Sequence, residues 1–322
     1  MTLSKLAKLC SVSISTASKA FSGSPDVNEM TREMIFRTAK EHGVFKKFYN
    51  VKYPRLAIAV IVPEFNSRHY GPLLHAISAL LEERGCVMSV AESNFLPEES
   101  EKMYDYFSIY TDVDGIIVID SLPESCAAPP IPCAVIGRAN PSKSTAIISL
   151  NTECAIREIL TDLKERGVRT VGFISEKKTV SKYEKVAKLA TEIIGSFDPE
   201  YSLVTEGRFE EGGYEGMTEL IKRGRVAEAI FCGYDNMAYG AMRALYDNGI
   251  CVPDRVALIG FDNNNESRFI SPSLTSIDTC TDECAEALVS AVIDMILGKP
   301  HAKSVTLRAA LHRRESTDVR LC

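Results

Sequence analysis

From residue 56 onward, short apolar runs alternate with segments in which apolar side chains recur every three or four positions. The runs are rich in β-branched and aliphatic residues and indicate buried strands at 56–62, 87–91, 115–119, 133–137, 170–174, 201–204, 227–233 and 256–261. The segments between them predict helices at 70–84, 97–110, 152–166, 181–195, 211–223 and 236–248. This alternation predicts an α/β fold with parallel sheets covered by helices on both faces.

The alternation forms two series, one before and one after about residue 150. Each series is long enough to form its own sheet, so we expect a body of two similar lobes. Ligands of open parallel sheets bind outside the carboxyl ends of the strands. The body is therefore predicted to hold a ligand in a cleft between its lobes.

The first 42 residues have a different pattern, that of three short helices. Residues 3–9 place Leu3, Leu6 and Ala7 on one face. Ser13 is a suitable N-cap for a second helix, and Asn28 for a third. The second helix, 14–21, is expected to turn Ala17, Ala20 and Phe21 inward, and the third, 28–42, to turn Met30, Met34, Ile35 and Ala39 inward.

The two short helices with a tight break between them predict a helix-turn-helix, because Ala7 and Ala17 allow the helices to cross closely. Short hydroxyls and one long cation on the outer face of the second helix suit the major groove of DNA. Ile14 is expected to touch a thymine methyl group and Ser15 and Lys19 to reach base edges. The full predicted DNA-binding set is Ser13, Ile14, Ser15, Thr16, Ser18, Lys19, Asn28, Lys46 and Lys47.

The charge of the chain is unevenly distributed. The whole chain carries −6, but residues 1–55 hold ten Lys and Arg against four Asp and Glu. The remainder holds 27 basic and 39 acidic residues. A basic head on an acidic body indicates that the head alone meets a polyanion.

The headpiece resembles that of the lactose-repressor/galactose-repressor (LacI/GalR) family of bacterial transcriptional regulators. Residues 12–23 read VSISTASKAFSG, where the family reads V-S-x-x-T-V-S-R-V-L-N-G. The preceding L-x-x-L-A-x-L fits the first helix of the family, and residues 27–43 fit its third. The body continues the resemblance at 229–245, at 249–262, at the S-P-S-L-T-S-I of 271–277 and at the R-E-S-T of 314–317.

The resemblance implies a domain organisation. It predicts a headpiece at 1–50, a shortened linker at 51–55 and an effector-binding and dimerisation domain at 56–322. Lobe 1 is expected to comprise about 56–148 and 279–298, and lobe 2 about 149–278 and 303–322. Family members are usually dimers that hold a palindromic operator in double-stranded DNA, and the chain lacks the C-terminal leucine heptads of the tetramers, so a homodimer is expected.

The resemblance also implies a small-molecule effector in the cleft, most often a sugar. After the first strand the chain reads PEFNSRHY, in which Tyr70 can stack on a flat ring. The predicted effector-binding residues are Asn66, Ser67, Tyr70, Arg138, Asp235 and Asp262. For the two aspartates, a helix-cap or turn role stays open as an alternative.

The chain departs from the family at two places. The linker lacks Ala-Arg-x-Leu, the family segment that wedges a leucine into the minor groove, and Phe48 or Tyr49 is either a substitute wedge or simply packs in the linker. An arginine expected near 181–184 is replaced by Lys182 or Tyr183, and Leu150 stands where an aspartate is usual. A regulator with a degenerate cleft, controlled by a protein partner, therefore stays open.

Other protein classes fit poorly. No glycine-rich dinucleotide motif, phosphate-binding loop or nucleophile elbow is present, so no enzyme activity and no cofactor are expected. The histidines lack a metal-ligand pattern, and the ten cysteines are interpreted as small buried hydrophobes. An exported sugar-binding protein would need a signal peptide, which the N-terminus does not resemble. Without an apolar run long enough for a membrane span, the protein is expected to be cytoplasmic.

Overall fold

The computed structural model describes residues 1–48, 56–120, 122, 131–139, 142 and 144–318. The chain forms two compact units, Met1–Leu56 and Ala57–Cys322. The predicted linker at 51–55 lies outside the described residues.

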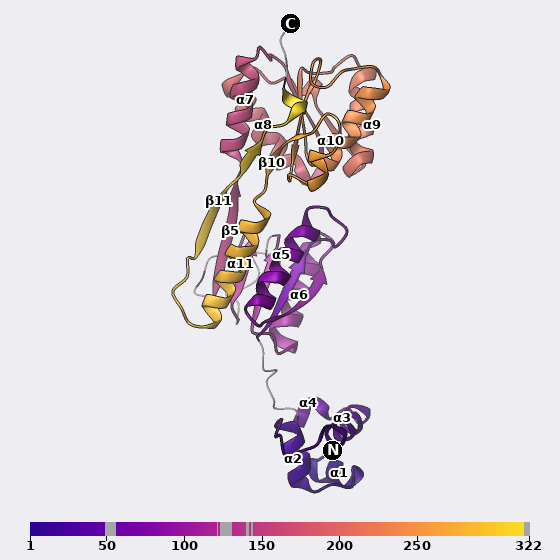
Figure 1. The fold of residues 1–322 in the computed structure, drawn as a ribbon, viewed down its shortest axis with the longest axis vertical. Helices are drawn as coiled ribbons and strands as arrows, with labels where there is room; N and C mark the ends of the chain where they lie inside the picture. Colours follow the sequence, from indigo (N-terminus) through magenta and orange to yellow (C-terminus); the bar gives the residue numbers. More distant parts are fainter. Residues whose placement is uncertain (49–55, 121, 123–130, 140–141, 143, 319–322) are drawn as a thin grey trace. The chain divides into compact units, whose positions relative to one another are not determined.

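The first unit is a helical headpiece (Figure 1), with α1 at Leu3–Leu9, α2 at Ile14–Phe21, α3 at Glu29–Glu41 and α4 at Phe45–Phe48. Both predicted caps are confirmed. The Oγ of Ser13 accepts a hydrogen bond from the Thr16 amide at 2.9 Å, and the Oδ1 of Asn28 accepts one from the Thr31 amide at 2.8 Å. These bonds satisfy amide groups that a helix start otherwise leaves unpaired.

The headpiece core is partly aromatic. The ring of Phe21 at the end of α2 lies 5.4 Å from that of Phe36 on α3, 6.0 Å from Phe45 and 5.7 Å from Phe48. Phe48 therefore packs onto the headpiece, which is the packing alternative for this residue. Tyr49, the other candidate, lies outside the described residues.

The prediction that Met30 and Met34 face inward is wrong. Their exposed fractions are 82% and 42%, whereas Ile35 and Ala39 are fully buried. The buried stripe of α3 runs through Ile35 and Ala39, with Phe36 packed against it. The two methionines lie on a different side of α3 from this stripe.

The second unit contains two six-stranded sheets. The first sheet has the order β11-β5-β4-β3-β1-β2, and all its described pairs are parallel. Its strands are β1 (Ala57–Val62), β2 (Val87–Glu92), β3 (Gly115–Ile119), β4 (Cys133–Ile136), β5 (Thr145–Asn151) and β11 (Ser304–Arg308). Helices α5 (Tyr70–Glu83), α6 (Pro97–Tyr110) and α11 (Thr281–Ile296) belong to this lobe.

The second sheet has the order β12-β10-β9-β8-β6-β7, with one antiparallel pair, β10 with β12. Its strands are β6 (Val171–Glu176), β7 (Leu203–Thr205), β8 (Ala229–Cys232), β9 (Ala257–Phe261), β10 (Thr275–Asp278) and β12 (Ala310–His312). Its helices are α7 (Glu153–Glu165), α8 (Val180–Ile193), α9 (Phe209–Lys222) and α10 (Asp235–Asp247), and four short 3-10 turns lie at Lys177–Thr179, Pro199–Tyr201, Asn265–Arg268 and Glu315–Thr317.

The chain passes between the sheets three times, after β5, after β10 and between β11 and β12. The expectation that residues 303–322 lie wholly in lobe 2 is therefore wrong for β11. This strand pairs with β5 in the first sheet, from Ser304 opposite Ile147 to Arg308 opposite Asn151. Only after Arg308 does the chain join the second sheet.

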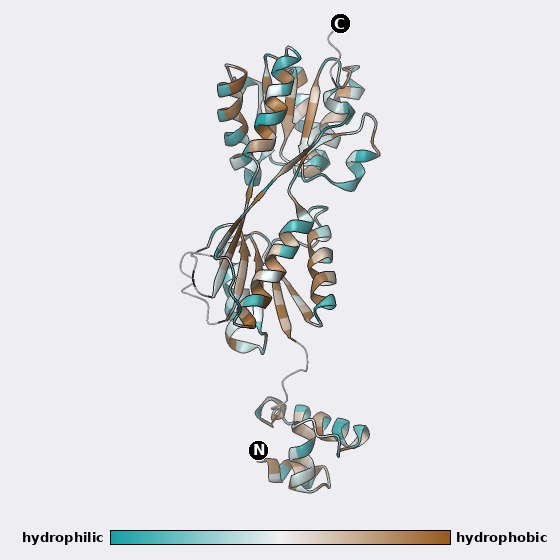
Figure 2. Cartoon of the chain, turned by 60° about the vertical axis from the view of Figure 1, so that its left-hand side comes forward, coloured by the Kyte–Doolittle hydropathy of each residue, from teal (hydrophilic) through white to brown (hydrophobic). Residues whose placement is uncertain are grey.

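The strands of both sheets are predominantly hydrophobic, whereas the helices carry mixed surfaces (Figure 2). The burial data agree, since every residue of β3, β6, β8 and β9 is buried. Fully buried strands are typical of parallel sheets covered on both faces. The body is thus the two-lobed α/β architecture that the sequence predicts.

Candidate functional site

Helix α2 presents a polar and basic face. Ala17, Ala20 and Phe21 are buried, whereas Ser15, Ser18 and Lys19 are exposed. Ile14 is also exposed, at 53%, although it is apolar. An exposed isoleucine beside short hydroxyls is suited to contact a base methyl group, so this face has the composition expected of a major-groove reader.

One carboxylate lies next to this face. The ammonium of Lys19 lies 2.7 Å from Asp26 Oδ2, and both side chains are largely exposed. The hydrogen bond and charge of Lys19 hold the pKa of Asp26 below its usual value. An exposed pair of this kind stabilises little, so Lys19 can exchange Asp26 for another acceptor.

The remaining predicted DNA-binding residues lie in different environments. Thr16 is half-buried and its hydroxyl lies 2.8 Å from that of Ser13. Asn28 uses its side chain as the cap of α3. Lys47 is exposed, with its ammonium 3.4 Å from the carbonyl oxygen of Met1, and the side chain of Lys46 lies outside the described part.

A pocket of about 740 Å³ is lined by both lobes of the body. It lies at the carboxyl ends of β3, β4 and β5 from the first sheet, where it meets the start of α8 and residues after β8 and β9 from the second. The first sheet supplies apolar lining through Ile119, Ile136 and Ile148. This is the position at which an open α/β sheet binds ligands.

Three of the six predicted effector residues line this pocket, namely Tyr70, Arg138 and Asp262. Ser67 does not line it, because its Oγ accepts hydrogen bonds from the amides of His69 and Tyr70 at the start of α5. Asn66 is exposed and is not part of the pocket lining. The structure thus brings Tyr70, Arg138 and Asp262 together and leaves the other three outside.

Asp235 is fully buried, contrary to the sequence prediction that it contacts the effector. Its Oδ1 accepts a hydrogen bond from the Ser276 hydroxyl at 2.6 Å, and its Oδ2 accepts one from Ser267 and one from the Asn264 amide, both at 2.7 Å. Burial, with a further contribution from the charge of Asp262, raises the pKa of Asp235 to about 7. Asp235 therefore links the start of α10 to strand β10 and to the loop that follows β9. This residue has a structural role in place of a contact with the effector.

Sequence reasoning named Lys182 only as a possible replacement for a family arginine, and it did not identify Lys178 or Lys185. Lys178, Lys182 and Lys185 all line the pocket, on the turn after β6 and the first two turns of α8. The ammonium of Lys182 donates to the carbonyl oxygen of Gly233 at 2.8 Å and lies 3.6 Å from Asp262. A signal was available, since residues directly after a buried parallel strand lie at the ligand-binding edge of its sheet.

Aromatic side chains complete the pocket. Tyr70, Phe95 and Tyr234 all line it, and the Tyr234 hydroxyl donates to Glu176 Oε1 at 2.7 Å. Burial raises the pKa of both tyrosines, so they are neutral hydrogen-bonding groups. Burial lowers the pKa of His69, 3.8 Å from Asp262, which keeps its ring neutral as well.

Ion pairs connect the two lobes around this pocket. Arg208, at the start of α9, contacts both carboxylate oxygens of Glu64 after β1, at 2.8 and 3.2 Å. The ammonium of Lys178 lies 3.2 Å from the ring centre of Phe95. Each contact involves a charged group that can also pair with water, so the lobes are held by interactions that a ligand can rearrange.

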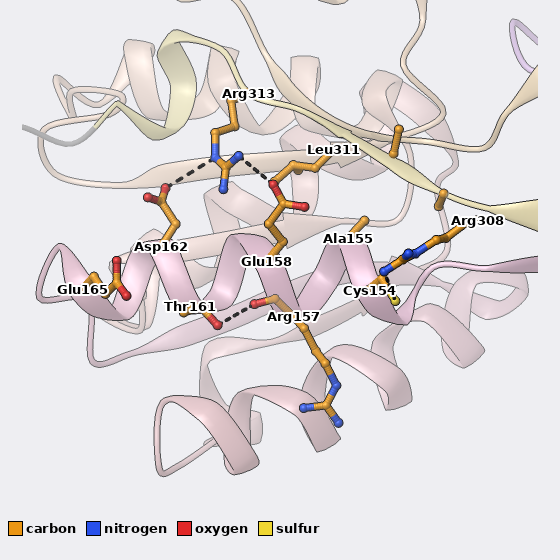
Figure 3. Close-up of a pocket in the computed structure, with 12 residues that line it drawn as sticks. Cys154, Ala155, Arg157, Glu158, Thr161, Asp162, Glu165, Arg308, Leu311 and Arg313 are labelled. Atoms are coloured by element: carbon orange, nitrogen blue, oxygen red, sulfur yellow. Dashed lines mark hydrogen bonds and ion pairs between the residues drawn. The ribbon is translucent and has the colours of Figure 1, made fainter.

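A second hollow of about 710 Å³ lies between α7 and the strands β11 and β12 (Figure 3). Within its lining, Arg313 lies 2.6 Å from Glu158, whereas Arg157 pairs with Glu153 and Glu192, which lie outside the lining. Three arginines and three carboxylates line this groove, so it carries no excess of charge. We therefore place the candidate ligand site in the pocket between the lobes.

Three further predictions can be compared with the described residues. No group of three or more metal-ligating side chains is found among them. None of their helices is long and apolar enough to cross a membrane. Six described cysteines are buried, as predicted, while Cys154 is half-buried and Cys251 is exposed.

The comparisons with known proteins agree with this architecture. The family model of the periplasmic binding protein-like domain matches residues 160–317. The chain is 24% identical over 332 residues to the HTH-type transcriptional regulator AscG of Escherichia coli, covering 98% of each chain. It is 26% identical over 299 residues to the HTH-type transcriptional repressor PurR of Histophilus somni, covering 86% of each.

Solved structures show the same fold. A transcriptional regulator of the LacI family from Silicibacter pomeroyi superposes with a TM-score of 0.75 at 21% identity, covering 99% of this chain and all of that one. The regulator CelR in complex with cellobiose superposes with a TM-score of 0.66 at 23% identity, covering 98% and 99%.

Together, the helix-turn-helix headpiece, the two-sheet body and these comparisons make the chain similar in sequence and in fold to transcriptional regulators of the LacI/GalR family. The relatives named above are transcriptional regulators and not enzymes, which agrees with the expectation from the sequence.

Proposed function

We propose that this protein is a sequence-specific DNA-binding transcriptional repressor, controlled by a small molecule in the pocket between the lobes. The observation that carries this proposal is that one chain contains two sites, one suited to DNA and one suited to a small molecule. One is the exposed polar and basic face of α2, and the other is the pocket at the carboxyl ends of parallel strands in the two sheets.

On the DNA side, we propose that a homodimer places α2 of each subunit in successive major grooves of a palindromic operator. Ile14, Ser15 and Lys19 contact bases, while the hydroxyls of Thr16 and Ser18 and the lysines that follow α3 contact phosphates. The exposure of Ile14 and Lys19 supports this role. Because phosphate contacts release counterions, operator binding weakens steeply as salt rises.

On the ligand side, we propose that Tyr70, Arg138 and Asp262 contact a carbohydrate or a carbohydrate derivative. The pocket volume of about 740 Å³ is adequate for such a molecule. Binding changes the arrangement of the two lobes and, in a dimer, the spacing of the two headpieces. The coupling between ligand and operator needs to be only about 1–3 kcal/mol.

The alternative of control by a protein partner without a ligand is less well supported. It was suggested by the missing arginine near 181–184, but Lys182 reaches the pocket from that segment. The pocket also combines aromatic and apolar side chains with charged groups that can orient a ligand.

The test of the DNA-binding proposal is a selection from a random pool of DNA duplexes with the purified full-length protein, followed by sequencing. The expected result is enrichment of a palindrome. The matched control is the chain without residues 1–50, which keeps the whole second compact unit and is expected to enrich nothing.

Two outcomes would contradict this proposal. Enrichment of the same palindrome by the truncated chain would place DNA recognition in the body. Absence of enrichment by the folded full-length protein, with and without sugars and sugar phosphates added, would show that the headpiece does not read DNA by itself.

A further inference from the structure

The pocket between the lobes carries an excess of positive charge. Four cationic side chains line it, against two carboxylates, and these are Arg138, Lys178, Lys182, Lys185, Asp120 and Asp262. His69 does not add to the charge, because burial lowers its pKa. The excess is unusual for its surroundings, since residues 56–322 carry 27 basic and 39 acidic side chains.

The three lysines share one face of α8 and its preceding turn. Positions 178, 182 and 185 are spaced by four and three residues, the spacing that places side chains one above another on a helix. Thr179 and Ser181 line the pocket as well, so the amino-terminal turn of this 14-residue helix faces it. The helix dipole therefore adds to the positive potential of the lysines.

Few carboxylates neutralise these lysines. Lys182 lies 3.6 Å from Asp262, but within the described residues no ion pair is formed by Lys178 or Lys185. Lys178 lies over the ring of Phe95, and Lys185 donates to the hydroxyl of Thr152 at 3.2 Å. Asp262 also lies 3.8 Å from the neutral ring of His69.

A partly buried lysine that forms no ion pair is stabilised when an anion binds beside it. Partial burial, together with the nearby charge of Arg208, lowers the pKa of Lys178, and the carboxylates of Glu176, Glu64 and Asp120 offset this effect only in part. Placing an ammonium away from water without full compensation by counter-charges costs free energy, and a bound anion would recover this cost. The pocket wall formed by α8 is thus complementary to negative charge.

We propose that the ligand of this pocket is a phosphorylated carbohydrate, whose phosphoryl group is held by Lys178, Lys182 and Lys185 at the start of α8. This inference rests on the proposed function, which places the effector in this pocket. Three cations suit a phosphate monoester, whose charge near neutral pH is about −1.5 to −2, better than a carboxylate with a single charge. Lysine is also a common phosphate ligand.

The rest of the pocket suits the uncharged part of such a ligand. Tyr70, Phe95 and Tyr234 offer aromatic faces against which a sugar ring can pack. The strand ends opposite α8 offer Ile119, Ile136 and Ile148, with Ser149 among them. The charged and the neutral part of the ligand would thus lie at different walls of one pocket.

The test is isothermal titration of the full-length protein with matched compounds. The panel consists of hexose and pentose phosphates, their unphosphorylated parent sugars, the corresponding sugar acids, and inorganic phosphate as a probe of the anion subsite alone. We expect at least one sugar phosphate to bind, inorganic phosphate to bind weakly in competition with it, and the parent sugar to bind at least about tenfold more weakly.

Variants locate the site. Lys182→Ala and Lys185→Ala are each expected to weaken sugar-phosphate binding by about tenfold or more. Lys188→Ala is the matched control, because Lys188 lies on the same helix, is exposed and does not line the pocket. It is expected to leave the affinity unchanged, and each variant is checked for an unaltered melting temperature without ligand.

The outcomes separate this inference from the proposed function. Equal binding of parent sugars and their phosphates, or preferential binding of sugar acids, would overturn the phosphate assignment while keeping a ligand-controlled regulator. Sugar-phosphate binding that both Lys182→Ala and Lys185→Ala retain would overturn the assignment to α8. If no compound or phosphate binds, the inference fails, and the selection of a palindrome by the same protein still decides whether it reads DNA.

Discussion

The headpiece and the body differ in how their sites are constructed. In the headpiece, the proposed reading surface is the exposed side of one eight-residue helix, and the buried side of that helix holds the unit together. In the body, the pocket is assembled from segments between residues 69 and 284, which meet only when two sheets have formed. A local site can change without altering the fold around it, whereas a pocket made from distant segments depends on the packing of the whole unit.

The two units also differ in the size of their cores. The headpiece cluster contains eight buried residues, with phenylalanines packed around Phe21. The body contains several larger clusters on the faces of its sheets. Because a small unit buries a smaller share of its surface, the headpiece should be the less stable of the two.

The largest expected effect follows from this difference. Phe21→Ala removes the ring at the centre of the headpiece cluster and should destabilise that unit by about 3–5 kcal/mol, which is comparable to the whole stability of such a domain. DNA binding is expected to be lost while the melting temperature of the body stays unchanged. Calorimetry and a DNA-binding assay measure both.

The control for this variant is Met30→Ala, since Met30 is 82% exposed and should contribute little to headpiece stability. Parallel loss of headpiece and body structure in Phe21→Ala would contradict the independence of the two units.

The second prediction concerns a substitution that destabilises the body and leaves the headpiece intact. A Cβ added at Gly240 on α10 would lie 1.8 Å from the backbone oxygen of Glu210 on α9, so the two helices would have to separate. Gly240→Ala should destabilise the body by about 1–3 kcal/mol. Gly71→Ala is the matched control, because a Cβ there meets nothing within 4 Å. Equal melting temperatures for the two variants would show that α9 and α10 are not as closely packed as described.

The third prediction is that the stability of the body depends on pH through Asp235, whereas that of the headpiece does not. Burial raises the pKa of Asp235 to about 7, so the folded body binds a proton that the unfolded chain has already lost. The stability from this group is complete at low pH and is lost as the pH rises towards 7, by roughly 1 kcal/mol per pH unit between about pH 5 and 7. Denaturant titrations should show this decline for the body and not for the headpiece, and Asp235→Asn should flatten it. A pH-independent body would refute the raised pKa.

The smallest expected effect concerns specificity within the headpiece. Lys19→Ala should lower discrimination between operator and variant sequences by about 1 kcal/mol, without loss of structure in either unit. Asp26→Asn breaks the same ion pair but keeps the cation, so it should retain the sequence preference. A competition assay with single-base operator variants measures both, and unchanged specificity in Lys19→Ala would remove the assigned role of this residue.

Local features of the sequence were sufficient for much of the molecule. The bounds of α1 and α2, the caps Ser13 and Asn28, and the alternation of strands and helices in the body follow from patterns within a few residues. Such patterns are reliable because capping and amphipathic spacing involve neighbours along the chain. Tyr70, Arg138 and Asp262 were identified through family motifs and do line the pocket.

Tertiary packing decided the rest. Whether Met30 or Phe36 covers the headpiece core depends on which side of α3 meets α2, and whether β11 joins the first or the second sheet depends on the pairing edge that β5 leaves open. Likewise, only the folded body separates Asp235, buried under the hydroxyls of Ser267 and Ser276, from the lysines of α8 that face the pocket. The sequence determined which elements form and which residue types are available, because these depend on local chemistry. The fold decided which side chains share a pocket, because that depends on contacts between segments far apart in the chain.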